Sequence, residues 1–410
     1  MTPRPQAVEK RRRGKVWSDG AGALRLRVLR EVSYSVLHTA QPVFDRDEPA
    51  LAEMAEASPV LFIADAAVAQ IYGEKWRDYA VARGLDVAGE LVLPISEALK
   101  VWEQVDGMCS YAARCGLPRN GLIVAIGGGV LLDAAGLAAA VFRRGIGYIR
   151  IPTTLVGMID VAVGIKQAVN AYGKKNLIGA FYPPVASIND YSFLQTLPAG
   201  ELVCGMAEII KMALIRDASL FEMIEKHGRE LVFSRFGSPI GIGRKILLRS
   251  ERLMMQELAP NLFEEEHARL VDFGHTFSPA IEVSSGYQIP HGQAVAIDML
   301  LSVSIAVARG IANPDVFTRL LVLLRKLGLQ VIPQLLPDRA RLFAALNEAR
   351  RHRGGCLNLV VIESPGRPQF LQDVSRADIE SACETLLAAA AHNEAAVNRS
   401  RCVGHGCSAV

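Results

Sequence analysis

Two histidines and one glutamate are the residues of this chain best suited to hold a metal ion. Glu208 lies in the segment GMAEIIK, His275 in VDFGHTFSP and His291 in IPHGQAV. Two neutral imidazoles and one carboxylate are the ligand set of an open catalytic Zn²⁺-type site, in which the remaining positions are left for substrate oxygens. Isolated histidines also serve as helix caps or hydrogen-bonded polar groups, so the metal site depends on whether the fold brings the three side chains together.

A run of three glycines marks a candidate phosphate-binding turn. The apolar segment LIVAI over residues 122–126 is typical of a buried strand, leads into Gly127–Gly129, and is followed by the helical composition VLLDAAGLAAAVF. Glycines let the backbone turn tightly, and the free N–H groups at the start of a helix attract a phosphate. The spacing differs from the GxGxxG pattern of dinucleotide-binding folds, and a purely structural turn explains the glycines equally well.

Charged side chains in apolar surroundings form a third candidate group. Asp160 and Lys166 lie in GMIDVAVGIK, and Lys211 follows Glu208 by one helical turn. On a helix, Glu208 and Lys211 share a face, and a surface ion pair is one interpretation of them. Their apolar neighbours favour burial instead, and buried charges are paired or functional.

The elements that must position these residues divide into two parts. From about residue 60, apolar strand patterns such as VLFIAD, LIVAI and YIRIP alternate with helical stretches, which predicts a parallel sheet in an α/β domain. After the break at Pro198, long amphipathic patterns predict a mostly helical second domain. We expect a flexible extension over residues 1–22, an α/β domain over 23–197, a helical domain over 198–388 and a flexible tail over 389–410.

Composition narrows the class of protein. Half of the 410 residues are hydrophobic and 21% are charged, as is typical of a globular enzyme, and the length suits two domains. A net charge of +3 gives no large electrostatic footprint for nucleic acid. The N-terminal sequence lacks the apolar region of a signal peptide, and no apolar run of about eighteen residues is free of charge. We therefore expect a cytoplasmic protein that binds neither nucleic acid nor membrane.

The motifs, taken in chain order, resemble the dehydroquinate-synthase superfamily of sugar phosphate cyclases. They are GGGVLLD, FRRG, IPTTLVGMID, VGIKQAVN, KKNLIGAFYPP, FLQTLP, GMAEIIK, DFGHTFSP and PHGQA, and the resemblance covers roughly residues 60–362. It implies an α/β N-terminal NAD-binding domain and a mostly α-helical metal-binding C-terminal domain, with the site in a cleft between them. It also implies a homodimer.

The resemblance implies roles for individual residues. Glu208, His275 and His291 would hold Zn²⁺ or Co²⁺. The residues that would bind NAD are Asp65, Glu97, Lys100, Gly129, Val130, Leu131, Leu132, Asp133, Thr153, Thr154, Lys166, Lys175, Phe193 and Thr196. The residues that would act on the substrate are Asp160, Lys166, Asn176, Lys211, Asp272 and His352, with Arg144 reaching the phosphate from the neighbouring subunit.

Departures from the family pattern indicate the subfamily. Dehydroquinate synthases carry a second histidine where this chain has Pro279, and an asparagine where this chain has Asp272. An arginine of those enzymes is Ala268 here, and a C-terminal catalytic lysine aligns with His352. The loss of cationic and amide groups fits a substrate without a carboxylate. Asp272 together with Pro279 resembles the 2-epi-5-epi-valiolone synthases, although Ala268 departs from their pattern as well.

The expected reaction is the cyclisation of sedoheptulose 7-phosphate to 2-epi-5-epi-valiolone with release of phosphate. In the cycle that the resemblance implies, NAD⁺ takes a hydride and returns it after phosphate elimination, and an aldol step closes the carbocycle. Alternatives are another seven-carbon cyclitol synthase, which makes 2-epi-valiolone or desmethyl-4-deoxygadusol, and 3-dehydroquinate synthase. An NAD-dependent polyol dehydrogenase is disfavoured by the lysines and Arg144, which suit a phosphate monoester. A non-catalytic homologue is disfavoured because all three candidate metal ligands are intact.

Overall fold

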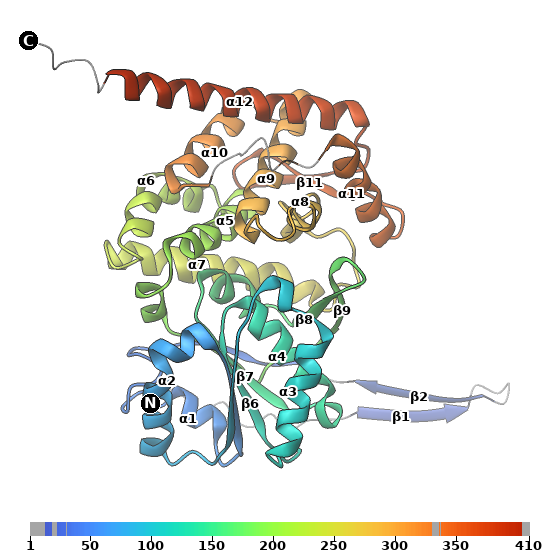
Figure 1. Ribbon diagram of the computed structural model, residues 1–410. Coiled ribbons are helices and arrows are strands. Elements are labelled where there is room, and N and C mark those ends of the chain that lie inside the picture. Colours follow the sequence, from blue (N-terminus) through green and yellow to red (C-terminus); the bar gives the residue numbers. More distant parts are fainter. Residues whose placement is uncertain (1–12, 19–22, 30, 330–335, 337, 404–410) are drawn as a thin grey trace, which may run out of the picture.

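Two halves of different architecture are stacked on each other in this computed structural model. It describes residues 13–18, 23–29, 31–329, 336 and 338–403. Figure 1 shows an α/β half in the lower part of the view and a helical half above it. The α/β half followed by a mostly helical half agrees with the fold class predicted from the sequence.

A six-stranded sheet forms the centre of the α/β half. Its strand order is β3–β10–β7–β6–β4–β5, and all neighbours are parallel. Strands that alternate with helices and run parallel are joined by crossover connections, which place all their carboxyl ends at one edge of the sheet. The strands are β3 (Ser35–His38), β4 (Val60–Asp65), β5 (Val87–Leu93), β6 (Leu122–Gly127), β7 (Gly147–Pro152) and β10 (Ala186–Asn189).

Alternate side chains of the central strands enter two separate cores. Ile123 and Ala125 of β6 pack with α3 (Trp102–Arg114) and α4 (Gly129–Val141). Val124 of the same strand belongs to the larger core, which includes α2 (Ala66–Arg83) and much of the helical half. Burial on both faces explains why this strand sequence is apolar throughout and does not alternate with polar residues.

The helical half surrounds one central helix. α9 (His291–Ala308) is the one described helix that is long and apolar enough to cross a membrane, and 78% of it is buried inside the protein. It is therefore a core helix. The other elements of this half are α5 (Ala199–Arg216), α6 (Ala218–Phe233), α7 (Ile240–Leu258), α8 (Ser278–Ser284), α10 (Pro314–Leu327), α11 (Arg339–His352), the antiparallel pair β11 (Leu359–Ser364) and β12 (Arg367–Leu371), and α12 (Arg376–Val403).

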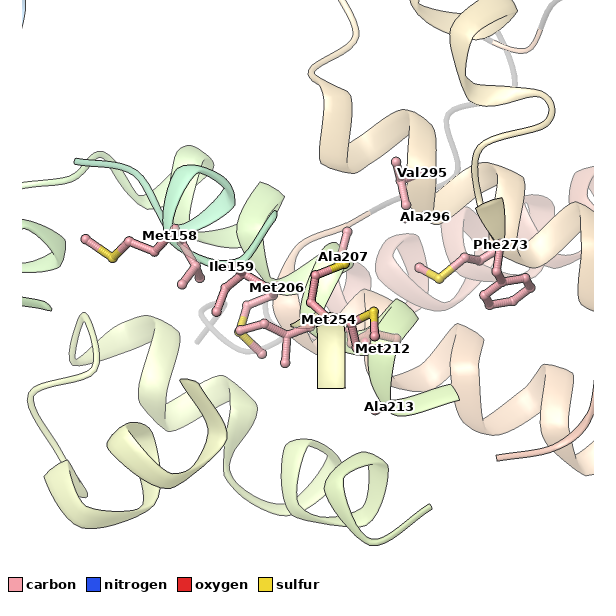
Figure 2. Close-up of a cluster of buried hydrophobic side chains, with 14 of the residues drawn as sticks. Met158, Ile159, Met206, Ala207, Met212, Ala213, Met254, Phe273, Val295 and Ala296 are labelled. Carbon is pink, nitrogen blue, oxygen red and sulfur yellow. The ribbon is translucent and has the colours of Figure 1, made fainter. Parts of the chain in front are cut away.

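Buried methionines fill the junction between the halves. Met158 of the π-helix η3 (Gly157–Val161) lies in one core cluster with Met206 of α5 and Met254 of α7 (Figure 2). The flexible thioether side chain suits an irregular gap between differently oriented elements. This packing holds α5, which carries Glu208, against η3, which carries Asp160.

The structure describes regular elements near both ends of the chain. β1 (Arg13–Ser18) and β2 (Leu24–Leu29) form an antiparallel hairpin that projects from the α/β half (Figure 1). At the other end, α12 continues past residue 388 to Val403, because its alanine-rich sequence has high helix propensity. Residues 1–12, 19–22 and 404–410 lie outside the described residues. The division into four segments stays a prediction.

Candidate active site

A cavity of about 1140 Å³ lies between the two halves. Residues at or directly beyond the carboxyl ends of three strands line it: Asp65 as the last residue of β4, Gly128 after β6 and Thr153 after β7. Ligands of open α/β sheets bind at this edge. The volume exceeds that of most small-molecule pockets and admits a cofactor and a substrate together.

Most residues predicted to bind NAD line this cavity. They are Asp65, Glu97, Lys100, Gly129, Val130, Asp133, Thr153, Thr154, Lys166, Lys175, Phe193 and Thr196. Leu131 and Leu132 do not, because their side chains are buried in the core between the sheet, α3 and α4. Val130 and Asp133 are three residues apart on α4 and share its cavity face, whereas the two leucines point inward. The binding roles themselves stay predictions.

The three glycines let the first turn of α4 pack closely against its surroundings. A Cβ atom on Gly127 would lie 2.6 Å from Leu131, and one on Gly128 would lie 3.0 Å from Thr154. The helix begins directly afterwards, so its first turn faces the cavity. The N–H groups of such a turn suit a phosphate, and the predicted phosphate-binding role fits this geometry.

A buried lysine joins the predicted cofactor and substrate residues. Lys100 is only 4% exposed, and its Nζ atom donates to Asp133 Oδ2 at 2.5 Å and to Asn176 Oδ1 at 2.7 Å. Burial raises the pKa of Asp133, although the charge of Lys100 opposes this shift. Asn176 lies on β9 (Lys174–Phe181), whose hairpin with β8 (Lys166–Ala171) lines the cavity. Cofactor and substrate residues therefore belong to one hydrogen-bonded network.

The three candidate metal ligands converge. Glu208 of α5, His275 of the loop before α8 and His291 at the start of α9 offer ligand atoms that all lie within 4.8 Å of one another. The Nε2 atoms of His275 and His291 lie 3.5 and 3.2 Å from the same oxygen, Oε1 of Glu208. Both imidazoles also line the cavity, so a metal ion held here would face the substrate.

Acceptor groups behind the histidines fix the orientation of both rings. Nδ1 of His291 lies 3.0 Å from Oε1 of Glu282, and Nδ1 of His275 lies 3.1 Å from the carbonyl oxygen of Phe273. Such contacts orient metal-ligating histidines and select the tautomer whose Nε2 is free to bind. Glu282, on α8, also pairs with Lys175. Sequence reasoning missed Glu282; the only signal was an acidic residue shortly before the histidine motif PHGQA.

The electrostatics of this cluster fit a divalent cation. Burial opposes ionisation of Glu208, but Lys211 and the two histidines outweigh it and hold its pKa well below the usual value. Burial together with Lys211 lowers the pKa of His275 to about 4, so this imidazole is neutral. Burial opposes the charge on His291, but Glu282 and Glu208 outweigh it and raise its pKa to about 9, so this ring must release a proton when it binds a cation. Apart from ion-pair contacts with Lys211 and the histidines, neither Glu208 oxygen accepts a hydrogen bond from a described residue. A buried carboxylate that lacks such partners is suited to metal coordination.

The predicted substrate residues lie around this cluster. Asp160, Lys166, Asn176, Lys211 and Asp272 all line the cavity. Glu208 and Lys211 form a buried ion pair, with side-chain exposures of 0% and 3%, which rules out a surface pair. The side chain of Lys166 is open to the cavity, yet enclosure by its walls and the nearby charge of Arg269 lower its pKa.

Asp272 is held by two arginines that sequence reasoning did not single out. Its Oδ1 accepts from Nη2 of Arg269 at 2.5 Å, and its Oδ2 accepts from Nη2 of Arg353 at 2.8 Å. Burial favours the neutral acid, but the arginines outweigh it and lower the pKa of Asp272. The two arginines directly follow Ala268 and His352, the positions at which this chain lacks the cationic groups of the dehydroquinate-synthase pattern.

Among the residues predicted to act on the substrate, Arg144 does not line the cavity of its own chain. Arg144 is exposed, at the end of the short helix η2 (Phe142–Arg144), and it adopts a positive φ of 64° after 50° at Arg143. Such backbone conformations are costly for non-glycine residues and are concentrated at functional sites. His352 ends α11, and its side chain lies outside the described residues.

Comparisons with known proteins agree with this architecture. The family model described as 3-dehydroquinate synthase N-terminal matches residues 90–204, and the model described as 3-dehydroquinate synthase C-terminal matches residues 205–348. The chain belongs to the 3-dehydroquinate synthase family. Membership of this family confirms the resemblance found in the motifs.

Within the family, several similar relatives carry one activity in their names. A 2-epi-5-epi-valiolone synthase of Streptomyces glaucescens is 42% identical over 349 residues, which is 84% of this chain and 89% of the relative. A 3-dehydroquinate synthase of Xanthomonas oryzae pv. oryzae is 34% identical over 83% of this chain and 93% of its own length. The solved structure of ValA, a 2-epi-5-epi-valiolone synthase from Streptomyces hygroscopicus subsp. jinggangensis 5008 with NAD⁺ and Zn²⁺ bound, superimposes with a TM-score of 0.84 at 38% identity. That match covers 88% of this chain and 99% of the ValA chain.

Proposed function

We propose that this protein is a sugar phosphate cyclase that converts sedoheptulose 7-phosphate to 2-epi-5-epi-valiolone with release of phosphate. The observation that carries the proposal is the ionised carboxylate of Asp272 on the cavity wall. It can accept a hydrogen bond from a sugar hydroxyl, whereas it would repel the carboxylate of a keto-acid substrate. Two anions about 4 Å apart repel by about 1 kcal/mol even at the dielectric constant of water. The names of the most similar relatives support the same substrate.

NAD and a divalent ion, Zn²⁺ or Co²⁺, are the cofactors of the proposed reaction. Glu208, His275 and His291 would hold the ion, and the cavity residues beyond β4, β6 and β7 would hold NAD. When bound, the metal polarises a substrate oxygen and NAD⁺ accepts a hydride that it later returns. The neutral state of His275 and the ionised state of Glu208 suit such coordination.

The cationic residues of the cavity bind the substrate in this scheme. Burial opposes the charge on Lys211, yet Glu208 and Asp160 outweigh it and raise its pKa, so Lys211 stays an ammonium beside the metal position. Lys166, on the opposite hairpin, has a lowered pKa and lies close to Glu264 at 3.0 Å. These groups hold the sugar phosphate and stabilise negative charge on oxygen during elimination.

We also propose a homodimer in which the partner's Arg144 reaches the substrate phosphate. In support, Arg144 is exposed and strained and does not line the cavity of its own chain. The hairpin β1–β2 offers further contact surface, because Val16 and Leu26 face each other in register with exposures of 67% and 69%. Light scattering of the purified protein would give twice the chain mass for a dimer, and the monomer mass would refute it. The cytoplasm is the expected location.

The test is incubation of the purified protein with sedoheptulose 7-phosphate, NAD⁺ and Co²⁺ or Zn²⁺, followed by identification of the cyclitol. We expect 2-epi-5-epi-valiolone and free phosphate in equal amounts, with no net NADH. Build-up of NADH in proportion to turnover would instead identify the protein as a dehydrogenase. A different cyclitol as product would agree with a sugar phosphate cyclase but would refute the proposed product.

A further inference from the structure

A carboxylate with an arginine on each oxygen forms part of the cavity wall. Arg269 binds Oδ1 of Asp272 and Arg353 binds Oδ2. Arg269 is three residues from Asp272, but Arg353 is 81 residues away, beyond the end of α11. The fold therefore brings two separate segments together on one side chain. We call these three residues the Asp272 clamp.

The arginines lie behind the carboxylate as seen from the cavity. Asp272 lines the cavity and neither arginine does, and the side chains of Arg269 and Arg353 are only 20% and 11% exposed. Nη1 of Arg353 also donates to the carbonyl oxygen of Leu357 at 2.7 Å, which anchors its guanidinium. Arg269 pairs in addition with Glu264, which in turn contacts Lys166. Asp272 consequently separates two partly buried positive charges from the cavity.

The charges of this wall are balanced only while Asp272 is ionised. Arg269 and Arg353 carry two positive charges, which the negative charges of Asp272 and Glu264 balance. Lys166, beside Glu264, adds one further positive charge, which is left for the substrate. Replacement of Asp272 by a neutral residue would leave a buried guanidinium without its counter-charge beside the cavity. A guanidinium in that position is a good partner for a carboxylate.

We propose that the Asp272 clamp determines which substrates the cavity accepts. Arg269 and Arg353 are positioning residues that hold the Asp272 carboxylate at the wall, and Asp272 in turn masks their charge. The clamp thus favours a substrate end that carries hydroxyls and rejects one that carries a carboxylate. This inference rests on the proposed cyclase function, because it assigns the basis of substrate choice in the same site.

The test compares binding of two compounds by the metal- and NAD-loaded enzyme. One is sedoheptulose 7-phosphate, and the other is the seven-carbon keto-acid phosphate from which dehydroquinate is made. We expect Asp272→Asn to tighten binding of the keto acid about tenfold or more, since it unmasks positive charge. We expect the double variant Asp272→Asn with Arg353→Met to lose that gain, since the unmasked charge is gone. Because the loaded enzyme turns over sedoheptulose 7-phosphate, the KM reports the affinity for this sugar, and the constant for inhibition of this turnover by the keto acid reports the affinity for the keto acid.

A structural role alone would give a different pattern. If the clamp only stabilised the fold, both variants would weaken both ligands together, and the double variant would not reverse the single one. Keto-acid affinity that is unchanged in Asp272→Asn, or a gain that persists in the double variant, overturns the proposal. Arg319→Met is a matched control, because Arg319 forms a two-point pair with Glu225 away from the cavity, and we expect wild-type binding of both compounds.

Two further measurements distinguish a positioning role of the clamp from a loss of stability and from a wrong substrate. Arg353→Lys retains the charge but not the fixed geometry, so we expect a KM for sedoheptulose 7-phosphate several-fold higher at nearly unchanged kcat. An unchanged KM would contradict positioning even if Asp272→Asn protein proved unstable. Failure of the wild-type enzyme to cyclise sedoheptulose 7-phosphate would refute the proposed function, whereas normal cyclisation with unchanged discrimination in the variants would refute only the clamp.

Discussion

The cofactor wall and the substrate wall of the cavity are built in different ways. The cofactor wall uses residues at or directly after the ends of neighbouring strands of one sheet, such as Asp65, Gly128 and Thr153. The substrate wall combines side chains from the hairpin β8–β9, from α5 and from the segment before α8, including Lys166, Lys211 and Asp272. The first wall follows from local sequence because strand ends meet at one edge. The second depends on tertiary packing, which brings Glu264 to Lys166 and Arg353 to Asp272.

Removal of a metal ligand is the largest disturbance of the substrate wall. We expect His275→Ala or His291→Ala to abolish stoichiometric metal binding and to lower cyclase activity by roughly a thousandfold or more, because two remaining ligands rarely hold a catalytic ion. Metal analysis of the purified variants, with an assay in added Zn²⁺, checks this. His227→Ala, on α6 and away from the cavity, is the control. Full metal content in either variant would show that the triad is misassigned.

Loss of the carboxylate behind His291 should have a smaller effect on the same ion. Burial opposes ionisation of Glu282, but His291 and Lys175 hold its pKa at about 2, so it is an anion at neutral pH. We expect Glu282→Gln to weaken zinc binding about 10- to 100-fold, the usual cost of losing such a contact. Competition with a chelator measures the affinity, with Glu222→Gln on α6 as the control. Wild-type zinc affinity would mean that Glu282 does not orient the ligand.

A change in the cofactor wall should leave the metal in place. Lys100→Met removes the hydrogen bonds to Asp133 and Asn176, and we expect about tenfold weaker NAD⁺ binding. Zinc content should stay at the wild-type level, because Lys100 does not contact the metal cluster. Lys245→Met, an exposed position on α7, serves as the control for a lost lysine. If zinc is lost along with NAD⁺, the two walls do not act separately.

The smallest expected effect concerns a buried acid that supports the segment after His275. Asp298 of α9 accepts from the backbone N–H groups of Phe277 and Ser278, and burial raises its pKa to about 6 despite these bonds. A raised pKa means that this group stabilises the fold at low pH and that its contribution is lost as the pH rises through about 6. Relative to Asp298→Asn, wild-type protein should therefore lose about 1.4 kcal/mol of unfolding free energy between about pH 5 and about pH 7.5. Urea denaturation at both pH values measures this difference, and a constant difference would contradict the assignment.

The sequence predicted the cofactor wall better than the partners of the catalytic charges. The α/β half, the helical half and the glycine turn are encoded by local patterns of apolar residues and by motifs. The convergence of Glu208, His275 and His291 followed only from the order of the family motifs, and the geometry agrees with it.

The sequence did not predict the roles of Glu282, Arg269 and Arg353, because each role depends on a contact that forms only in the folded chain. Arg353 is adjacent to His352, which the motif comparison matched to a catalytic lysine. A single sequence does not reveal which side chain neutralises the buried Asp272. Leu131 and Leu132 show the converse. They lie inside a functional motif, yet their side chains belong to the core.

The central claim is that the substrate wall selects a sugar phosphate without a carboxylate. A direct competition tests it: the wild-type enzyme, loaded with NAD⁺ and Zn²⁺, receives equal concentrations of sedoheptulose 7-phosphate and the keto-acid phosphate precursor of dehydroquinate. We predict that 2-epi-5-epi-valiolone is essentially the only cyclic product. Dehydroquinate as the main product would contradict both the proposed reaction and the role assigned to Asp272.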